Sequence, residues 1–203
     1  MATIEELEKL AKQGSIEAML DLGDALAKNG DIEGKIKCYR KAAEQADKFQ
    51  NDPTNLNLCL YGKRNLGMLL ASPPSDENGY ETNPKGAFDI FREIISDYPS
   101  SRQAMFTRCD LGMMYYDSAN KEYNIPHDAE EGIALIKEWE RLCIEAHGSL
   151  NDFAFYCFRA GSTIAFNASN EEDKAYAVKL LKEISRDNNA IYEQAQKILT
   201  LIQ

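Results

Sequence analysis

The stretch that decides the fold is RNLGMLL, residues 64–70, because its Leu-Gly-Met motif recurs in RCDLGMMYY, residues 108–116. A related Leu-Gly pair stands in DLGDAL, residues 21–26, and Ala160-Gly161 is a weaker fourth copy. The glycines of these pairs are Gly23, Gly67, Gly112 and Gly161. They are 44, 45 and 49 residues apart along the chain. Regular spacing of this size predicts an array of helical hairpins.

The repeated glycine has a physical reason in helix packing. A glycine inside a helix costs about 1 kcal/mol relative to alanine, so its repetition needs a compensating contact. Two antiparallel helices approach closely only where their side chains are small. A second small residue stands five positions before each of the first three glycines: Ala18, Gly62 and Thr107. We therefore expect each Leu-Gly pair to lie inside the first helix of a hairpin, where that helix touches the second.

The rest of the chain also has helical periodicity. In the tail, Ile191, Ala195, Ile198 and Ile202 recur every three or four residues. Sustained alternation between Asn-Gly or Asp-Gly turns, the signal of strands, is nearly absent. The sequence therefore predicts an all-α fold. The expected helices span 3–13, 15–29, 31–50, 54–71, 84–97, 100–118, 126–147, 149–168, 171–187 and 189–202.

Capping patterns agree with these helices. Thr3 with Glu6 and Ser100 with Gln103 have the spacing of a capping box, in which two side chains satisfy free N–H groups at a helix start. Glycines stand where three of the helices should end in a left-handed residue: Gly14, Gly30 and Gly148.

The first hairpin resembles the Sel-one-like repeat, a relative of the tetratricopeptide repeat. The stretch KLAKQGSIEAMLDLGDALAKNGDIEGKIKCYRKAAEQ, residues 9–45, is similar to the pattern Ala-x(4)-Leu-Gly, a loop, and a helix ending in Tyr-x-x-Ala-Ala. The second and third hairpins keep Leu-Gly but end in FREIIS and WERLCIE. The resemblance implies an α-solenoid with a binding role, and it transfers no catalytic residue. The matching positions are Ala18, Leu22, Gly23, Tyr39, Ala42 and Ala43.

We therefore expect a right-handed α-solenoid, an α-α superhelix of about four helical hairpins that forms a single repeat domain over residues 1–203. The helix at 3–13 would serve as a half-unit, and the helix at 189–202 would cap the C-terminal end, which otherwise exposes an apolar face. The expected hairpins span 15–50, 54–97, 100–147 and 149–187.

The charge balance is acidic, with 23 Lys and Arg against 33 Asp and Glu and a formal net charge of −10. A nucleic-acid-binding protein presents a basic face, so this class of partner is disfavoured. No apolar run approaches the about 20 residues that a membrane span needs, so no membrane partner is expected. The N-terminal MATIEELEKLAKQG is acidic and amphipathic, unlike a signal or transit peptide, which favours a cytoplasmic protein.

Catalytic and metal-binding patterns are weak. The chain has five cysteines without disulfide-framework spacing, which predicts reduced and mostly buried thiols. Cys143 and His147 are four residues apart on one helix, but a structural zinc site needs four such ligands and His127 is the only other histidine. No phosphate-binding loop or nucleophile motif occurs. We therefore expect a non-enzymatic protein without a metal or cofactor.

The expected function is a protein-interaction scaffold or adaptor that binds a peptide or a partner's surface in a concave groove. The alternative is an acidic cytoplasmic neutralising protein, such as an immunity protein, that covers a basic partner, since charge complementarity speeds association.

The groove residues follow from the family's register, in which the first helix of each hairpin lines the inner surface. With the motif glycine facing the partner helix, that register assigns to the groove the residues six and three before it, and one and four after it. Of these, Tyr61, Arg64, Met68 and Tyr116 are expected to be partly exposed, with Arg64 anchoring a carboxylate. A core role for the same residues stays open, because periodicity does not separate a groove face from a core face. The predicted partner-binding groove consists of Tyr61, Arg64, Met68, Phe106, Met113, Tyr116 and Phe155.

Two long loops, residues 71–83 and 117–126, are the other candidate contact site. Both follow the first helix of a hairpin, and loops of this length often carry function, although insertions are also simply tolerated at such places.

Overall fold

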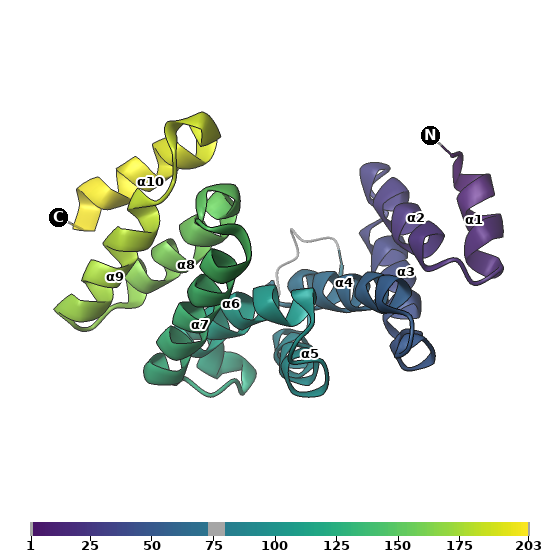
Figure 1. Ribbon diagram of the computed structural model, residues 1–203, viewed down its shortest axis with the longest axis horizontal. Helices are drawn as coiled ribbons and strands as arrows, with labels where there is room; N and C mark the ends of the chain where they lie inside the picture. Colours follow the sequence, from purple (N-terminus) through teal and green to yellow (C-terminus); the bar gives the residue numbers. More distant parts are fainter. Residues whose placement is uncertain (1, 73–79, 203) are drawn as a thin grey trace. The chain divides into compact units, whose positions relative to one another are not determined.

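The computed structural model of the chain describes residues 2–72 and 80–202. These residues form helices and connecting turns, and none of them lies in a strand, which confirms the all-α fold class. The chain divides into two compact units, Met1–Ala104 and Met105–Gln203, called here the first and the second unit. In each of them, helices that follow one another in the sequence pack side by side (Figure 1).

The first unit is a succession of paired helices. Each of its α-helices contacts the next one along the chain, and α2 also contacts α4. Its elements are α1 (Ile4–Lys12), α2 (Ile16–Lys28), α3 (Ile32–Ala43), the short 3-10 helix η1 (Ala46–Phe49), α4 (Pro53–Leu70) and α5 (Pro84–Asp97).

The second unit contains most of α6 and the elements after it. Within this unit α8 packs on α9, and α10 contacts both of them. Its elements are α6 (Arg102–Tyr116), η3 (Ser118–Tyr123), α7 (Ala129–His147), η4 (Asn151–Phe153), α8 (Ala154–Asn167), α9 (Glu171–Lys182), η5 (Arg186–Asn188) and α10 (Asn189–Ile202).

Most helix boundaries lie within a few residues of the predicted ones, but three predicted helices are divided. The segment 31–50 forms α3 and then η1, because the N–H of Gln45 bonds the carbonyl of Ala42 at 3.1 Å and tightens the chain into a 3-10 turn. Segment 149–168 starts with η4 before α8, and segment 171–187 ends in η5 after α9.

The helix ends confirm most of the predicted caps. Thr3 and Glu6 form the expected capping box, with the Thr3 N–H donating to Glu6 Oε2 at 2.8 Å. The second predicted box is wrong, because the cap is Ser101, whose hydroxyl accepts the Ala104 N–H at 3.0 Å, and alanine has no side chain to return the bond. The three predicted left-handed glycines all have positive φ: Gly14 at 95°, Gly30 at 87° and Gly148 at 78°.

The Leu-Gly glycines lie inside α2, α4, α6 and α8, at close contacts with the next helix, as predicted for the first three of them. A side chain would collide with its neighbour at Gly67, Gly112 and Gly161 and would make a tight contact at Gly23. A Cβ added at Gly23 would lie 3.1 Å from the ring of Tyr39, and a Cβ added at Gly67 would lie 2.5 Å from the ring of Phe91. At Gly112 the added Cβ would lie 2.7 Å from the carbonyl oxygen of Gly132. At Gly161 it would lie 2.8 Å from the side chain of Leu181.

The core of the second unit is a cluster of buried side chains. It surrounds Trp139, Cys143 and Cys157, none of which has exposed surface. All five cysteines of the chain are free thiols, and four of them are buried, as the sequence predicts. The thiols therefore fill space in the core as small apolar groups.

Candidate functional site

The structure does not support the predicted central groove as an exposed surface. Only 5% of Arg64, 8% of Phe106, 6% of Met113 and 1% of Tyr116 is exposed. The expectation that Arg64 and Tyr116 are partly exposed is therefore wrong, and the core role left open for these residues applies to Phe106, Met113 and Tyr116. All three belong to the buried cluster of the second unit.

Tyr116 shows why the register failed. It lies four residues after Gly112, and residues four apart share one face of a helix. Tyr116 therefore faces α7 together with the glycine, and a Cβ added at Gly132 of α7 would lie 3.0 Å from it. Its hydroxyl donates a hydrogen bond to Asp173 Oδ2 at 2.8 Å.

Three of the predicted groove residues keep accessible surface. Tyr61 is 39% exposed and Phe155 49% exposed, while Met68 is half-buried. Tyr61 and Met68 lie on α4 in the first unit, and Phe155 lies on α8 in the second. Their role in partner binding stays a prediction.

Of the two long loops, residues 117–126 form an ordered turn on the end of α6. The Asp117 carboxylate accepts the Ala119 N–H at 3.0 Å and begins η3. The Asn120 amide donates to the Met114 carbonyl at 3.0 Å, and Ile125 is only 2% exposed. In the other loop, 71–83, residues 73–79 lie outside the described part of the chain.

A groove that the sequence analysis missed lies in the first unit, between α3 and α5 with α4 as its floor. It encloses a volume of about 340 Å³. We call it the α3–α5 groove. Its lining combines apolar and charged side chains: Arg40, Ala43, Glu44, Ala46, Asp47, Lys63, Leu66, Ile90, Glu93, Asp97 and Tyr98.

Two glycines of α4 explain why this groove is open. Gly62 lies against α3, where an added Cβ would be 3.2 Å from Ala42, and Gly67 lies against Phe91 of α5. Successive helix residues are rotated by about 100°, so these glycines point about 140° apart. Lys63 and Leu66 project into the sector between them, about 100° and 40° from Gly62. The sequence contained this signal, since it places a small residue five positions before the motif glycine.

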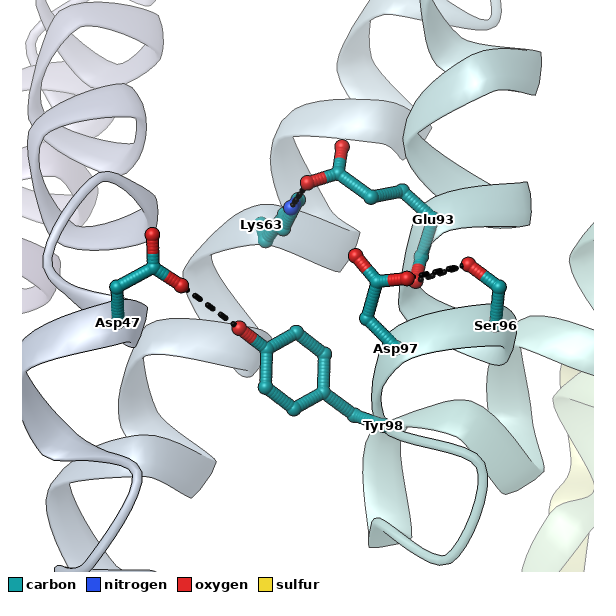
Figure 2. Close-up of polar contacts among 6 residues, drawn as sticks. All are labelled: Asp47, Lys63, Glu93, Ser96, Asp97 and Tyr98. Atoms are coloured by element: carbon teal, nitrogen blue, oxygen red, sulfur yellow. Dashed lines mark hydrogen bonds and ion pairs between the residues drawn. The ribbon is translucent and has the colours of Figure 1, made fainter.

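The charged side chains of the groove form contacts across its helices (Figure 2). Lys63 of α4 is paired with Glu93 of α5. Tyr98, at the end of α5, reaches across to η1 and donates its hydroxyl proton to Asp47 Oδ1 at 3.3 Å. Burial raises the pKa of Tyr98, and the Asp47 carboxylate raises it further, so the phenol stays a protonated donor. Asp97 accepts the hydroxyl of Ser96 at 2.6 Å.

The groove has unbalanced negative charge at the end formed by η1 and the last turn of α5. Lys63 is already neutralised by Glu93. Glu44, Asp47 and Asp97 form no ion pair with any other residue that the structure describes.

A second basic side chain, Arg40, lines the groove one helical turn before Glu44. It also lines an adjoining cavity of about 300 Å³, whose other charged residues are Glu33, Lys37 and Glu81. Arg40 also forms no ion pair within residues 2–72 and 80–202.

The thiols and histidines are not assembled into a reactive site. Burial raises the pKa of Cys59 to about 11 and that of Cys143 and Cys157 to about 12, which disfavours the nucleophilic thiolate. Cys143 is fully buried, whereas His147 is exposed and packs edge-on against Phe153. Across the described residues, no group of three or more His, Cys, Asp and Glu side chains could hold a metal ion.

Comparison with known proteins gave no relative. None of the protein-family models matches the chain, and searches of curated proteins and of solved structures found no significant match. Within residues 2–72 and 80–202, no helix is both long enough and apolar enough to cross a membrane.

Proposed function

We propose that this chain is a non-enzymatic protein-interaction scaffold, built as a right-handed α-solenoid of Sel-one-like hairpins. In this proposal α2/α3, α4/α5, α6/α7 and α8/α9 are the four hairpins of one repeat domain, α1 is a half-unit and α10 is the cap. The glycine contacts inside the four pairs support it, because one contact recurs at the same place in each pair. The sequence of residues 9–45 supports the family.

The observation that carries the binding role is the α3–α5 groove. Helix arrays bind partners through surfaces that extend over several repeats. The groove is formed by two successive hairpins, because α3 belongs to one and α4 and α5 to the next. Its volume of about 340 Å³ is open along an apolar floor that includes Leu66 and Ile90. We propose this groove as the main contact surface, in place of the buried residues of α6.

Site-specific photo-crosslinking tests this function. A photoreactive amino acid replaces Glu44, which lies exposed in the groove, and in a control variant it replaces Lys9, which is exposed on α1. Irradiation in cells should give a discrete adduct with a partner protein at Glu44 and none at Lys9. Calorimetry with the purified partner should then give a stoichiometric complex. If adducts are missing at Glu44 and also at Tyr61 and Phe155, the chain is not the proposed scaffold.

A neutralising function is the second candidate, and the charge of the chain favours it. The formal net charge is −10, and three of the contributing carboxylates lie in the groove without a cation partner among the described residues. A protein that covers a basic partner associates faster at low salt, because long-range attraction steers the encounter. Stopped-flow association at several salt concentrations separates the two functions. A steep fall of the rate constant favours the neutraliser, and a flat dependence favours the scaffold.

A further inference from the structure

We propose that the α3–α5 groove binds an extended segment of a partner protein and takes up one lysine or arginine side chain between Glu44, Asp47 and Asp97. This inference rests on the proposed function and specifies the chemistry of the partner. It follows from the shape of the groove, from its apolar floor and from the position of its uncompensated charges.

The shape of the groove fits a chain segment with side chains. Its volume of about 340 Å³ is far larger than a metal ion requires. It falls at the lower end of the range of about 300–1,000 Å³ that is usual for organic ligands. Ala43, Leu66 and Ile90 give the floor an apolar surface, on which the aliphatic stem of a lysine or arginine can lie while its charged end stays in water.

The charges select a basic residue and place it at one end. Lys63 does not repel a cation strongly, because Glu93 neutralises it. Asp47 is held by the Tyr98 hydroxyl at 3.3 Å, which fixes the position of its carboxylate without cancelling its charge. Arg40, one helical turn before Glu44, favours a carbonyl or carboxylate of the segment next to the basic side chain.

The test uses the isotope-labelled full chain and two capped heptapeptides, one with lysine alternating with leucine and one with glutamate in place of lysine. The lysine peptide should shift the backbone NMR signals of Glu44, Asp47, Lys63, Asp97 and Tyr98, and the glutamate peptide should not. The double variant Asp47→Asn/Asp97→Asn should weaken binding by about three- to tenfold, because it removes two of the carboxylates that face the basic side chain and exposed ion pairs are individually weak.

A matched control separates the groove from the general acidity of the chain. Glu17→Gln/Asp21→Asn makes the same change of charge at two exposed positions on α2, away from the groove. It should leave the affinity within about twofold, because neither residue lines the groove and the field of exposed charges is screened by salt. Equal weakening in both double variants, shifts centred elsewhere, or the same groove shifts produced by calcium chloride alone would overturn the inference.

The inference and the proposed function fail in different ways. A partner that is captured by crosslinking and binds the Asp47→Asn/Asp97→Asn variant with unchanged affinity removes the basic-segment inference and leaves the scaffold function in place. A chain that captures no partner at any of the tested positions removes the scaffold function itself. Circular dichroism of each variant checks that the helices are retained.

Discussion

The hairpin α4/α5 of the first unit and the hairpin α6/α7 of the second use the same Leu-Gly motif, but the glycine meets a different kind of neighbour. Gly67 faces the ring of Phe91, whereas Gly112 faces the backbone carbonyl of Gly132. A ring can turn or shift by a few tenths of an ångström, but a helix backbone can yield only by moving the whole helix. The motif therefore predicts close contact in both places, and the neighbour decides how strictly glycine is required.

The largest effect is expected at the backbone contact. A Cβ added at Gly112 would lie 2.7 Å from the carbonyl oxygen of Gly132 and 2.8 Å from the side chain of Ile136. Gly112→Ala should therefore destabilise the second unit by about 3 kcal/mol, the upper part of the usual cost of overpacking. Alanine favours the helix over glycine by about 1 kcal/mol, which is smaller than this cost, so the variant should still be less stable than the parent. Urea denaturation followed by circular dichroism measures the loss.

The reciprocal substitution is the control for this contact. A Cβ added at Gly132 would lie 2.8 Å from the Gly112 carbonyl, so Gly132→Ala should give a loss of similar size. If either variant unfolds at the same urea concentration as the parent, the two backbones are not in the close contact described.

A smaller effect is expected where the glycine faces an aromatic ring. Gly67→Ala should cost about 1–2 kcal/mol, because the ring of Phe91 must shift away from a Cβ at 2.5 Å, and since the ring is buried, the shift strains its neighbours without moving a whole helix. At Gly23 the nearest atom of Tyr39 is 3.1 Å away. Here the strain is nearly offset by the gain of about 1 kcal/mol in helix propensity. The thermal midpoint should decrease most for Gly112→Ala, less for Gly67→Ala and least for Gly23→Ala. A larger decrease for Gly23→Ala than for Gly112→Ala would contradict the comparison.

The glycine contacts could be predicted from the sequence because they depend on a local spacing. The repeated Leu-Gly pair fixes the contact of each hairpin, and helical periodicity fixes the helices around it. The groove could not be predicted with the same success. The register used for Arg64 treated α4 as a helix with one neighbour, whereas the two glycines of α4 face different helices. Gly62 touches α3 and Gly67 touches α5, so the open sector lies between them.

The contacts that line the groove are even less accessible to sequence reasoning. Tyr98 and Asp47 are 51 residues apart and meet only because α5 returns alongside η1. Such a pair depends on tertiary packing, and the periodicity of the sequence within a helix does not predict it.

A third prediction compares two similar polar clusters. In the first unit Asp24 accepts a hydrogen bond from Tyr39 at 2.6 Å and pairs with Lys35 at 2.8 Å. In the second unit Glu140 accepts from Tyr176 at 2.9 Å and pairs with Lys179. The side chain of Asp24 is 44% exposed and that of Glu140 only 10%, so water can replace the lost partner more easily at Asp24.

The tyrosine hydroxyls test this difference. Tyr176→Phe should destabilise by about 1.5–2 kcal/mol, because it removes a hydrogen bond to a buried charged group. Tyr39→Phe should cost about 0.5–1 kcal/mol, since water can solvate the exposed carboxylate. Urea denaturation of both variants measures the two losses. Equal losses would show that exposure of the carboxylate does not govern the strength of these bonds.

The smallest effect is a pH dependence expected for Asp24. Burial alone would raise the pKa of Asp24, but hydrogen bonds from Lys35 and Tyr39 outweigh it and lower the pKa below the ordinary value. A carboxyl whose pKa is lower in the folded state stabilises the fold above its unfolded pKa of about 4, and this contribution is lost as the pH falls through the folded value.

At pH 7, Asp24→Asn should therefore be less stable than the parent by about 0.5–1 kcal/mol, the size of a partly exposed ion pair. At pH values well below 4 the difference should shrink, because the parent carboxyl is then protonated and has lost its charge.

Asp21→Asn, at an exposed position three residues earlier on α2, removes the same charge without these partners and should change stability little at either pH. A deficit of Asp24→Asn that persists or grows at low pH would contradict this prediction, because the loss would then come from the amide side chain itself and not from the missing charge.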